Sequence, residues 1–143
     1  MKGSYLCILL RSIFLFISER SFMSRPVHFE IPAENAERAT KFFGDVFGWT
    51  FNSWGDGADY FLADTGKEGM GINGAIMKRR DPGQPLVNSI DVPSIDEFAK
   101  KIEASGGTMV VPKVTVPTMG YSAYFKDTEG NIHGLWQTDP SAK

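Results

Sequence analysis

Two short segments of the chain alternate polar and apolar residues, and a helical pattern follows each of them. The segments are residues 28–32 and 89–93, and in both the second and fourth residues are apolar while the first and third are polar. A period of two predicts a strand with its apolar side on a core. The polar side chains, among them His28 and Glu30, then point to the opposite face of the sheet.

Each predicted strand leads into a stretch with apolar residues at helical spacing. The first stretch is residues 33–47, and Gly48 follows it as a stop signal. The second stretch is residues 94–104, where Ser94 is a suitable N-cap and residues 106–107, both glycine, end the helix.

Three short β-like runs follow each predicted helix, so the same order of elements occurs twice, in residues 26–78 and 86–138. This order predicts an α+β fold of two βαβββ modules with mainly antiparallel sheets, joined by a turn-rich linker. A helix covers one face of each sheet, so the remaining faces are expected to enclose a cup for a ligand. The runs are residues 49–54, 58–63 and 70–77 in the first copy and 108–114, 121–125 and 131–137 in the second.

The composition narrows the classes of partner. Among 143 residues, 15 Lys and Arg stand against 17 Asp and Glu, which gives no reason to expect nucleic acid or an anionic membrane as a partner. The single cysteine, Cys7, excludes an intrachain disulfide and a cysteine-based metal cluster. A small organic molecule is the expected partner.

Residues 1–22 differ in character from the rest of the chain. An apolar stretch, residues 5–17, follows a basic start and is interrupted by Arg11 and Ser12. A secretory signal is one interpretation, but the arginine and the lack of a small-residue cleavage site speak against it. The stretch is also too short for a membrane span, which needs about 20 apolar residues. We favour an extension outside a single domain of residues 23–143, which predicts a cytoplasmic protein.

Several motifs of the repeat occur together in a known family. They are residues 28–32, residues 42–49 around the first helix end, the glycines 106–107, and residues 127–131 before the last run. In duplicate and at this spacing they resemble the vicinal oxygen chelate superfamily, which includes glyoxalase I, extradiol dioxygenases and bleomycin-resistance proteins. The resemblance covers nearly all of residues 26–138 and implies the same two-module fold.

The resemblance also implies positions for a divalent metal, because enzymes of the family typically hold one with two side chains from each module. The corresponding residues here are His28, Gly74, Ser89 and Gly134. Glycine offers no ligand and serine is a weak one, so His28 alone is a candidate metal ligand. Chemistry of the glyoxalase I type is therefore not favoured, and no cofactor is predicted with certainty.

Further candidates come from the strand faces and loops of the predicted cup. Either His28 and Glu30 act together as a base steadied by a carboxylate, or His28 is a polar residue at a strand start. Residues 112–120 form either a lid or a plain hairpin connection. His133 has the opposite parity to Gly134 and is expected to face away from the cup. The expected ligand contacts are Trp54, Tyr60, Gly74, Ile76, Ser89, Met119, Tyr121, Gly134 and Trp136.

Three functions follow as hypotheses, and the sequence leaves the choice between them open. The first is an enzyme, a lyase or isomerase related to lactoylglutathione lyase, that uses His28 and Glu30. The second is a protein that binds or sequesters a small organic molecule, such as an antibiotic, without changing it. The third is a structural protein whose cup is an interface. The depleted metal positions favour binding, since antibiotic-binding relatives tend to need no metal. The family often forms dimers, so a homodimer is a further expectation.

Overall fold

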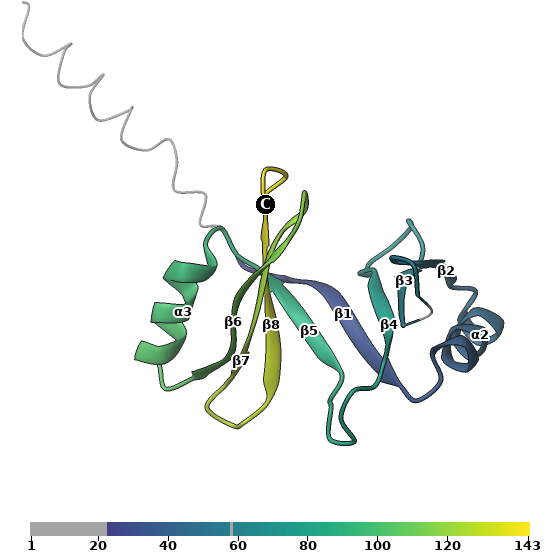
Figure 1. Cartoon of the computed structure of the whole chain (residues 1–143), viewed down its shortest axis with the longest axis horizontal. Coiled ribbons are helices and arrows are strands. Elements are labelled where there is room, and N and C mark those ends of the chain that lie inside the picture. Colours follow the sequence, from purple (N-terminus) through teal and green to yellow (C-terminus); the bar gives the residue numbers. More distant parts are fainter. Residues whose placement is uncertain (1–22, 58) are drawn as a thin grey trace, which may run out of the picture.

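The computed structural model describes residues 23–57 and 59–143, so Cys7 and the predicted N-terminal extension lie outside the described residues. The described chain has the element order β-α-β-β-β twice (Figure 1), which confirms the predicted α+β fold of two βαβββ modules. The elements are β1 (Pro26–Ala33), α2 (Ala36–Phe47), β2 (Thr50–Ser53), β3 (Tyr60–Asp64), β4 (Gly74–Lys78), β5 (Val87–Asp91), α3 (Ile95–Ala104), β6 (Thr108–Val116), β7 (Gly120–Lys126) and β8 (Ile132–Thr138).

All of these strands form one sheet in the order β2-β3-β4-β1-β5-β8-β7-β6. Within each module the first strand runs parallel to the last, and the other neighbours are antiparallel. The modules join where β1 and β5 pair antiparallel, with His28 opposite Ser89, and we call this pairing the β1–β5 seam. Figure 1 shows the two halves of the sheet diverging from the seam, with α2 and α3 on their outer sides. Two modules of one chain therefore enclose a concave inner face.

Capping chemistry decides where helix α2 begins and ends. The helix begins at Ala36 rather than at the predicted Ala33, because the Asn35 side chain accepts a hydrogen bond from the backbone N–H of Arg38 and caps it. Ala33 instead ends strand β1. Gly48 ends the helix as predicted, in the left-handed conformation with φ 71°.

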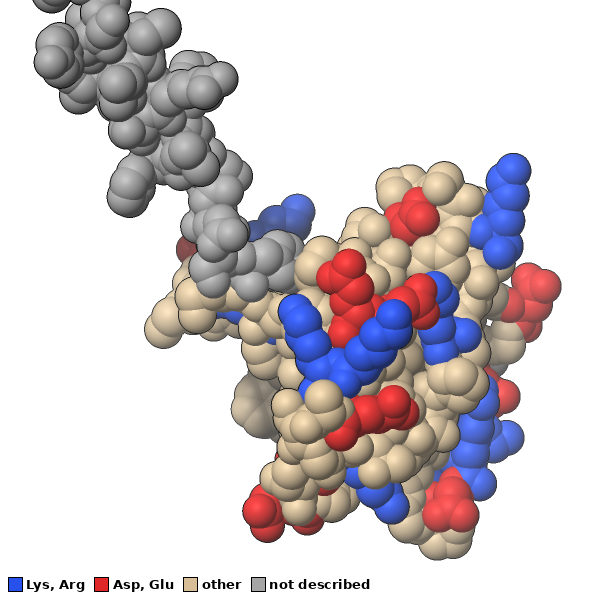
Figure 2. Space-filling model, turned by 90° about the vertical axis from the view of Figure 1, so that its left-hand side faces the viewer, with Lys and Arg blue, Asp and Glu red and all other residues tan. Residues whose placement is uncertain are grey.

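Helix α3 agrees more closely with its prediction. The Ser94 hydroxyl accepts a hydrogen bond from the backbone N–H of Glu97, so Ser94 is the N-cap. Figure 2 views the side of the molecule that carries α3 and shows Lys and Arg interspersed with Asp and Glu. This side therefore forms no single-sign patch of the kind that nucleic acid requires. Neither described helix has the length and apolar character that a membrane crossing needs.

The outer face of the sheet packs against the helices, and the two modules fill this space with different side chains. Aromatic rings fill it in the first module, where Phe29 and Phe43 pack on Trp49 with centroid distances of 5.5 and 4.9 Å. The second module instead buries a compact cluster near α3, which consists of Val92, Ile95, Ala123 and Leu135.

Residues 112–120, for which a lid and a plain hairpin were the two alternatives, form a hairpin connection. Strand β6 continues to Val116, and a turn of residues 117–119 leads into β7. At its tip, Thr118 has a positive φ of 63°, and its backbone N–H donates to the Ala142 carbonyl at 2.9 Å. The C-terminal residues therefore hold the tip of this hairpin.

Candidate functional site

The concave face holds a cavity of about 730 Å³ between the two modules. Residues of β1 and β3 line it on one side, and residues of β5 to β8 line it on the other. Its volume and partly apolar wall are those of sites for small organic molecules. The apolar part of the wall consists of Val27, Trp54, Leu62, Val116, Met119 and Trp136.

Glu30 is the centre of a hydrogen-bonded group on the concave face. The Tyr60 hydroxyl donates to Oε1 of Glu30 at 3.1 Å, and the Tyr124 hydroxyl donates to Oε2 at 2.8 Å. Tyr60 belongs to the first module and Tyr124 to the second, so the carboxylate links the two halves of the cup. Both oxygens already have a strong donor, which satisfies a partly buried charge.

His28 lies at one end of this chain of hydrogen bonds. Its Nε2 is 3.1 Å from the Tyr60 hydroxyl oxygen. Since the Tyr60 hydroxyl donates its hydrogen bond to Glu30, Nε2 of His28 carries the ring hydrogen and donates to the Tyr60 oxygen. In the neutral ring this leaves Nδ1 as an acceptor. Burial lowers the pKa of His28 below its ordinary 6.5, and the nearby Glu30 charge opposes this effect. His28 is therefore neutral at pH 7.

The two tyrosines keep their protons at neutral pH. Burial raises the pKa of Tyr60 and of Tyr124 well above the ordinary 10.0, and the charge and hydrogen bonds of Glu30 raise both further. A deprotonated phenol beside this carboxylate would be strongly repelled. Both hydroxyls therefore act as donors to Glu30.

Most of the predicted site residues meet around this cavity. They come from strands of both modules and from the hairpin between β6 and β7, and their roles in catalysis or binding stay predictions. The predicted residues that line the cavity are His28, Glu30, Trp54, Tyr60, Ser89, Met119 and Trp136.

Gly74 and Ile76 do not face the cavity, contrary to expectation. In the parallel pairing of β1 with β4, Gly74 lies opposite Phe29 and Ile76 opposite Ile31, so both share the outer face with these apolar residues. The Phe29 ring fills the space at Gly74, where a Cβ would lie 2.4 Å from it. The pairings of β4 and β8 show that Gly74 corresponds to the residue after Gly134 rather than to Gly134 itself.

Gly134 and Tyr121 are also absent from the cavity lining. Gly134 lies opposite Ser89, whose hydroxyl oxygen would be 2.3 Å from a Cβ at this position. The glycine thus permits close packing of two strands and does not offer bare backbone to a ligand. Tyr121 packs on the outer side, against the buried cluster near α3. His133 also faces outward, as predicted, and stacks on Phe125 of the same region.

Five charged or polar residues line the cavity without belonging to the predicted set, namely Arg80, Asp91, Ser122, Tyr124 and Thr138. Tyr124 had a signal in the sequence, because the run that begins with it echoes the run that begins with Tyr60. Asp91 had one too, since it occupies the place in the second module that Glu30 has in the first. Arg80 follows β4 in the linker, where strand parity gives no guidance.

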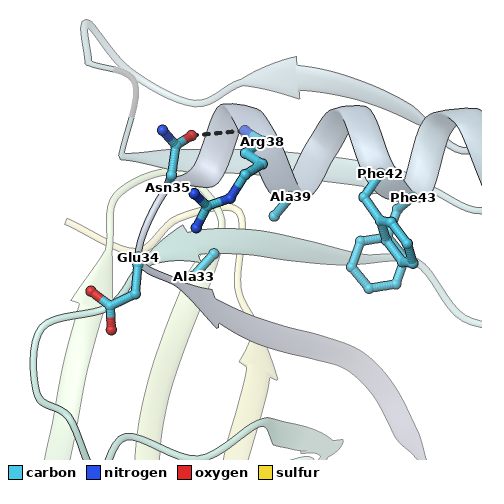
Figure 3. Close-up of a pocket in the computed structure, with 7 residues that line it drawn as sticks. All are labelled: Ala33, Glu34, Asn35, Arg38, Ala39, Phe42 and Phe43. Atoms are coloured by element: carbon cyan, nitrogen blue, oxygen red, sulfur yellow. Dashed lines mark hydrogen bonds between the residues drawn. The ribbon is translucent and has the colours of Figure 1, made fainter.

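A second hollow of about 390 Å³ lies at the start of α2 (Figure 3). Figure 3 shows Phe42 and Phe43 at one end and Glu34 turned away from the helix at the other. Its polar side chains include Asn35, which already caps α2, and Glu34, which pairs with Arg79 at 3.1 Å. The concave cavity, where most of the predicted residues meet, is therefore the candidate site.

Known proteins resemble this chain in both sequence and fold. The family model described as bleomycin resistance protein-like N-terminal matches residues 25–66. A glyoxylase-like domain-containing protein from Didymella fabae is 29% identical over 119 residues, which cover 74% of this chain and 88% of the relative.

Two solved structures have the same fold. One is a member of the glyoxalase/bleomycin resistance protein/dioxygenase superfamily from Vibrio splendidus, with a TM-score of 0.59, 15% identity, and coverage of 82% of this chain and 100% of that one. The other is methylmalonyl-CoA epimerase from Mycobacterium tuberculosis, with a TM-score of 0.63, 14% identity, and coverage of 80% and 88%. In sequence and in fold, the chain is therefore similar to proteins of the glyoxalase and bleomycin-resistance type. At these identities the two structures establish the fold alone and leave the activity open.

The metal arrangement that the vicinal oxygen chelate resemblance implies does not fit the residues on the concave face. Gly74 turns to the outer face and Gly134 has no side chain, so only His28 and Ser89 remain of the four positions. Among residues 23–57 and 59–143, no three His, Cys, Asp or Glu side chains are grouped so that they could hold a metal ion. Glu30 is close by, but both of its carboxylate oxygens already accept hydrogen bonds from tyrosine hydroxyls. This donor set is poor in ligands for a divalent cation.

Proposed function

We propose that the cup binds a small, partly apolar organic molecule without changing it chemically. The cavity volume of about 730 Å³ suits such a ligand, and aromatic and aliphatic side chains form much of its wall. The family model, with its bleomycin-resistance description, supports binding or sequestration as the role. A homodimer, which the resemblance implies, stays a prediction.

One observation carries this proposal: the polar side chains on the floor of the cavity are hydrogen-bonded to one another. These side chains are His28, Glu30, Tyr60 and Tyr124. Tyr60 and Tyr124 occupy both oxygens of Glu30, and His28 is held by Tyr60. A floor that is satisfied in advance is rigid and orients a ligand at little entropic cost. The same hydrogen bonds reduce the capacity of Glu30 to act as a base.

The test is a thermal-shift screen of small aromatic and alicyclic compounds against the full chain, with and without a chelator. A ligand at one hundred times its dissociation constant stabilises the folded state by about 2.7 kcal/mol. The variant Ser122→Phe fills the cavity from β7. Its matched control is Thr115→Phe, an exposed position in the same hairpin that pairs with Tyr121 on the outer face.

Stabilisation that Ser122→Phe abolishes and Thr115→Phe retains, with the ligand recovered unchanged, would support binding in the cup. Stabilisation that persists in Ser122→Phe would place the ligand elsewhere and overturn the proposal. A screen without any stabilising compound would also count against it.

A second candidate function is metal-independent proton transfer, and the state of His28 favours it. The ring is neutral at pH 7, and its Nε2 is fixed by Tyr60. Its Nδ1 is then available to accept a proton from a carbon next to a carbonyl, with the electron pair passing to the carbonyl oxygen. This is the lyase or isomerase type of chemistry, with His28 as the base.

Proton transfer is tested by following deuterium exchange by NMR at the carbon next to a carbonyl in compounds that bind. Catalysed exchange that His28→Gln abolishes, while binding persists, would support the enzyme. Exchange at the uncatalysed rate in the wild-type protein would rule it out for those compounds and leave the binding role.

A further inference from the structure

We infer that the ligand of the cup is an organic anion whose charged group docks on Arg80. This inference rests on the proposed function, because it names the class of molecule that the same cavity would take. Three observations support it: the positions of the charges along the cavity, the negative charge of Glu30 on its floor, and the lack of an ion pair at Arg80 within the described part of the chain.

Arg80 and Asp91 both line the cavity, and their backbones lie near opposite ends of β1. The backbone N–H of Arg79, just before Arg80, donates to the carbonyl of Ala33, the last residue of β1. The backbone N–H of Asp91 donates to the carbonyl of Arg25, just before β1 begins. An extended strand rises about 3.3 Å per residue, so the 8 residues of β1 separate these two anchors by roughly 26 Å. The cavity is therefore positive toward one end and negative toward the other.

The guanidinium of Arg80 has no carboxylate within 4.0 Å among residues 23–57 and 59–143. The neighbouring Arg79 is already paired with Glu34. The backbone N–H of Arg80 donates to the side-chain oxygen of Gln84 at 2.8 Å, and this hydrogen bond holds the backbone of Arg80 in place. Its charge acts on Tyr124, whose pKa it lowers against the larger effect of burial. Arg80 is thus an exposed cation that lines the cavity and has no carboxylate partner among the described residues.

An unpaired guanidinium beside an apolar wall suits a flat anion such as a carboxylate. The planar fork of arginine binds both oxygens of a carboxylate, and charge-assisted hydrogen bonds of this kind are stronger than neutral ones. Trp54 and Leu62 line the cavity from the first module and offer surface for an apolar body. Glu30 and Asp91 repel an anion from the floor and the far end, so they orient it toward Arg80.

The experiment compares each of several aromatic carboxylates with its primary amide, for example naphthalene-2-carboxylate with naphthalene-2-carboxamide. Each pair has nearly the same shape and differs in charge. Titration calorimetry on the full chain at low salt measures the dissociation constants. The variants are Arg80→Gln and, as the matched control, Lys78→Gln, which removes a nearby exposed charge that does not line the cavity.

We expect at least one carboxylate to bind about tenfold more tightly than its amide, an advantage that Arg80→Gln removes and Lys78→Gln retains. Equal affinities within every pair, or an advantage that survives Arg80→Gln, would overturn the inference while the binding role stands. The inference also falls alone if no pair binds but neutral compounds from the screen still do. If neither the pairs nor the screen compounds bind, both the inference and the proposed function are refuted.

Discussion

The two modules have the same order of elements but contribute differently to the protein. The first module provides His28, Glu30 and Tyr60, three of the four polar side chains that hold one another on the cavity floor. Its helix α2 leaves Phe42 and Phe47 more than half exposed. The second module buries a compact aliphatic cluster near α3. Repetition of one scaffold thus leaves one copy free to carry most of the polar site while the other carries a well-packed core.

The largest expected difference between the modules lies in their helices. Ile95 at the start of α3 is 1% exposed, whereas Phe47 at the end of α2 is 59% exposed. Ile95→Ala should lower the free energy of unfolding by about 2–5 kcal/mol, because it leaves a cavity in a packed cluster. Phe47→Ser should change it by less than about 1 kcal/mol. Urea denaturation of both variants checks this, and equal losses would contradict the division between the modules.

A second, smaller difference concerns the two glycines that look equivalent in the sequence. An alanine at Gly74 would press on the Phe29 ring, which is packed against Trp49. An alanine at Gly134 would meet the smaller Ser89 hydroxyl, which can rotate. Gly74→Ala should therefore cost about 1–3 kcal/mol of overpacking, and Gly134→Ala should cost less.

Melting temperatures of the two alanine variants, measured side by side, rank the costs. If Gly134→Ala were the more damaging of the two, the assignment of Gly74 to the outer face would be wrong.

The hydrogen bond between Tyr124 and Glu30 links the two modules, and it should contribute to the free energy of unfolding about as much as a typical hydrogen bond. Tyr124→Phe removes the hydroxyl that donates to Glu30 across the cup, and the expected loss is about 1 kcal/mol. Tyr60→Phe removes a donor to the same carboxylate within the first module and also the partner of His28. Chemical denaturation of both variants measures the losses. A Tyr124→Phe protein as stable as the wild type would show that this link contributes nothing to stability.

The smallest expected effect is a pH dependence of stability that belongs to the first module. Because the folded pKa of His28 lies below 6.5, the unfolded chain binds the proton more readily, and unfolding becomes easier as the pH falls below about 6.5. His28→Gln should flatten this part of the stability profile. The pKa of Asp127 is also lowered from its ordinary 3.8, chiefly by the hydrogen bond from His133. Asp127 therefore changes the stability of the protein only at more acidic pH, below about 3.8.

Denaturation midpoints between pH 5 and 8 measure the effect of His28 separately. An unchanged slope in His28→Gln would mean that His28 is not the group that titrates.

Local rules made the fold predictable, whereas the site depends on pairings that span the chain. Strand periodicity and the Ser94 cap need only neighbouring residues, so they are visible in the sequence. The prediction for Gly74 is wrong because aligning it with Gly134 shifts β4 by one residue. A shift of one residue moves every side chain of a strand to the opposite face. For Tyr124 the sequence offered only the echo of the run that begins with Tyr60, and its contact with Glu30 spans most of the chain. Arg80 reaches the cavity from a linker, where no strand pattern applies.

The β1–β5 seam also sets the symmetry of the cup. His28 and Ser89 occupy the same place in their respective modules, and they lie directly opposite each other. A local twofold axis of the antiparallel pair therefore passes between them. Were both residues identical, a molecule seated on the axis would have two equivalent ways to bind. With an imidazole on one side and a hydroxyl on the other, the cup distinguishes the two ends of whatever it holds.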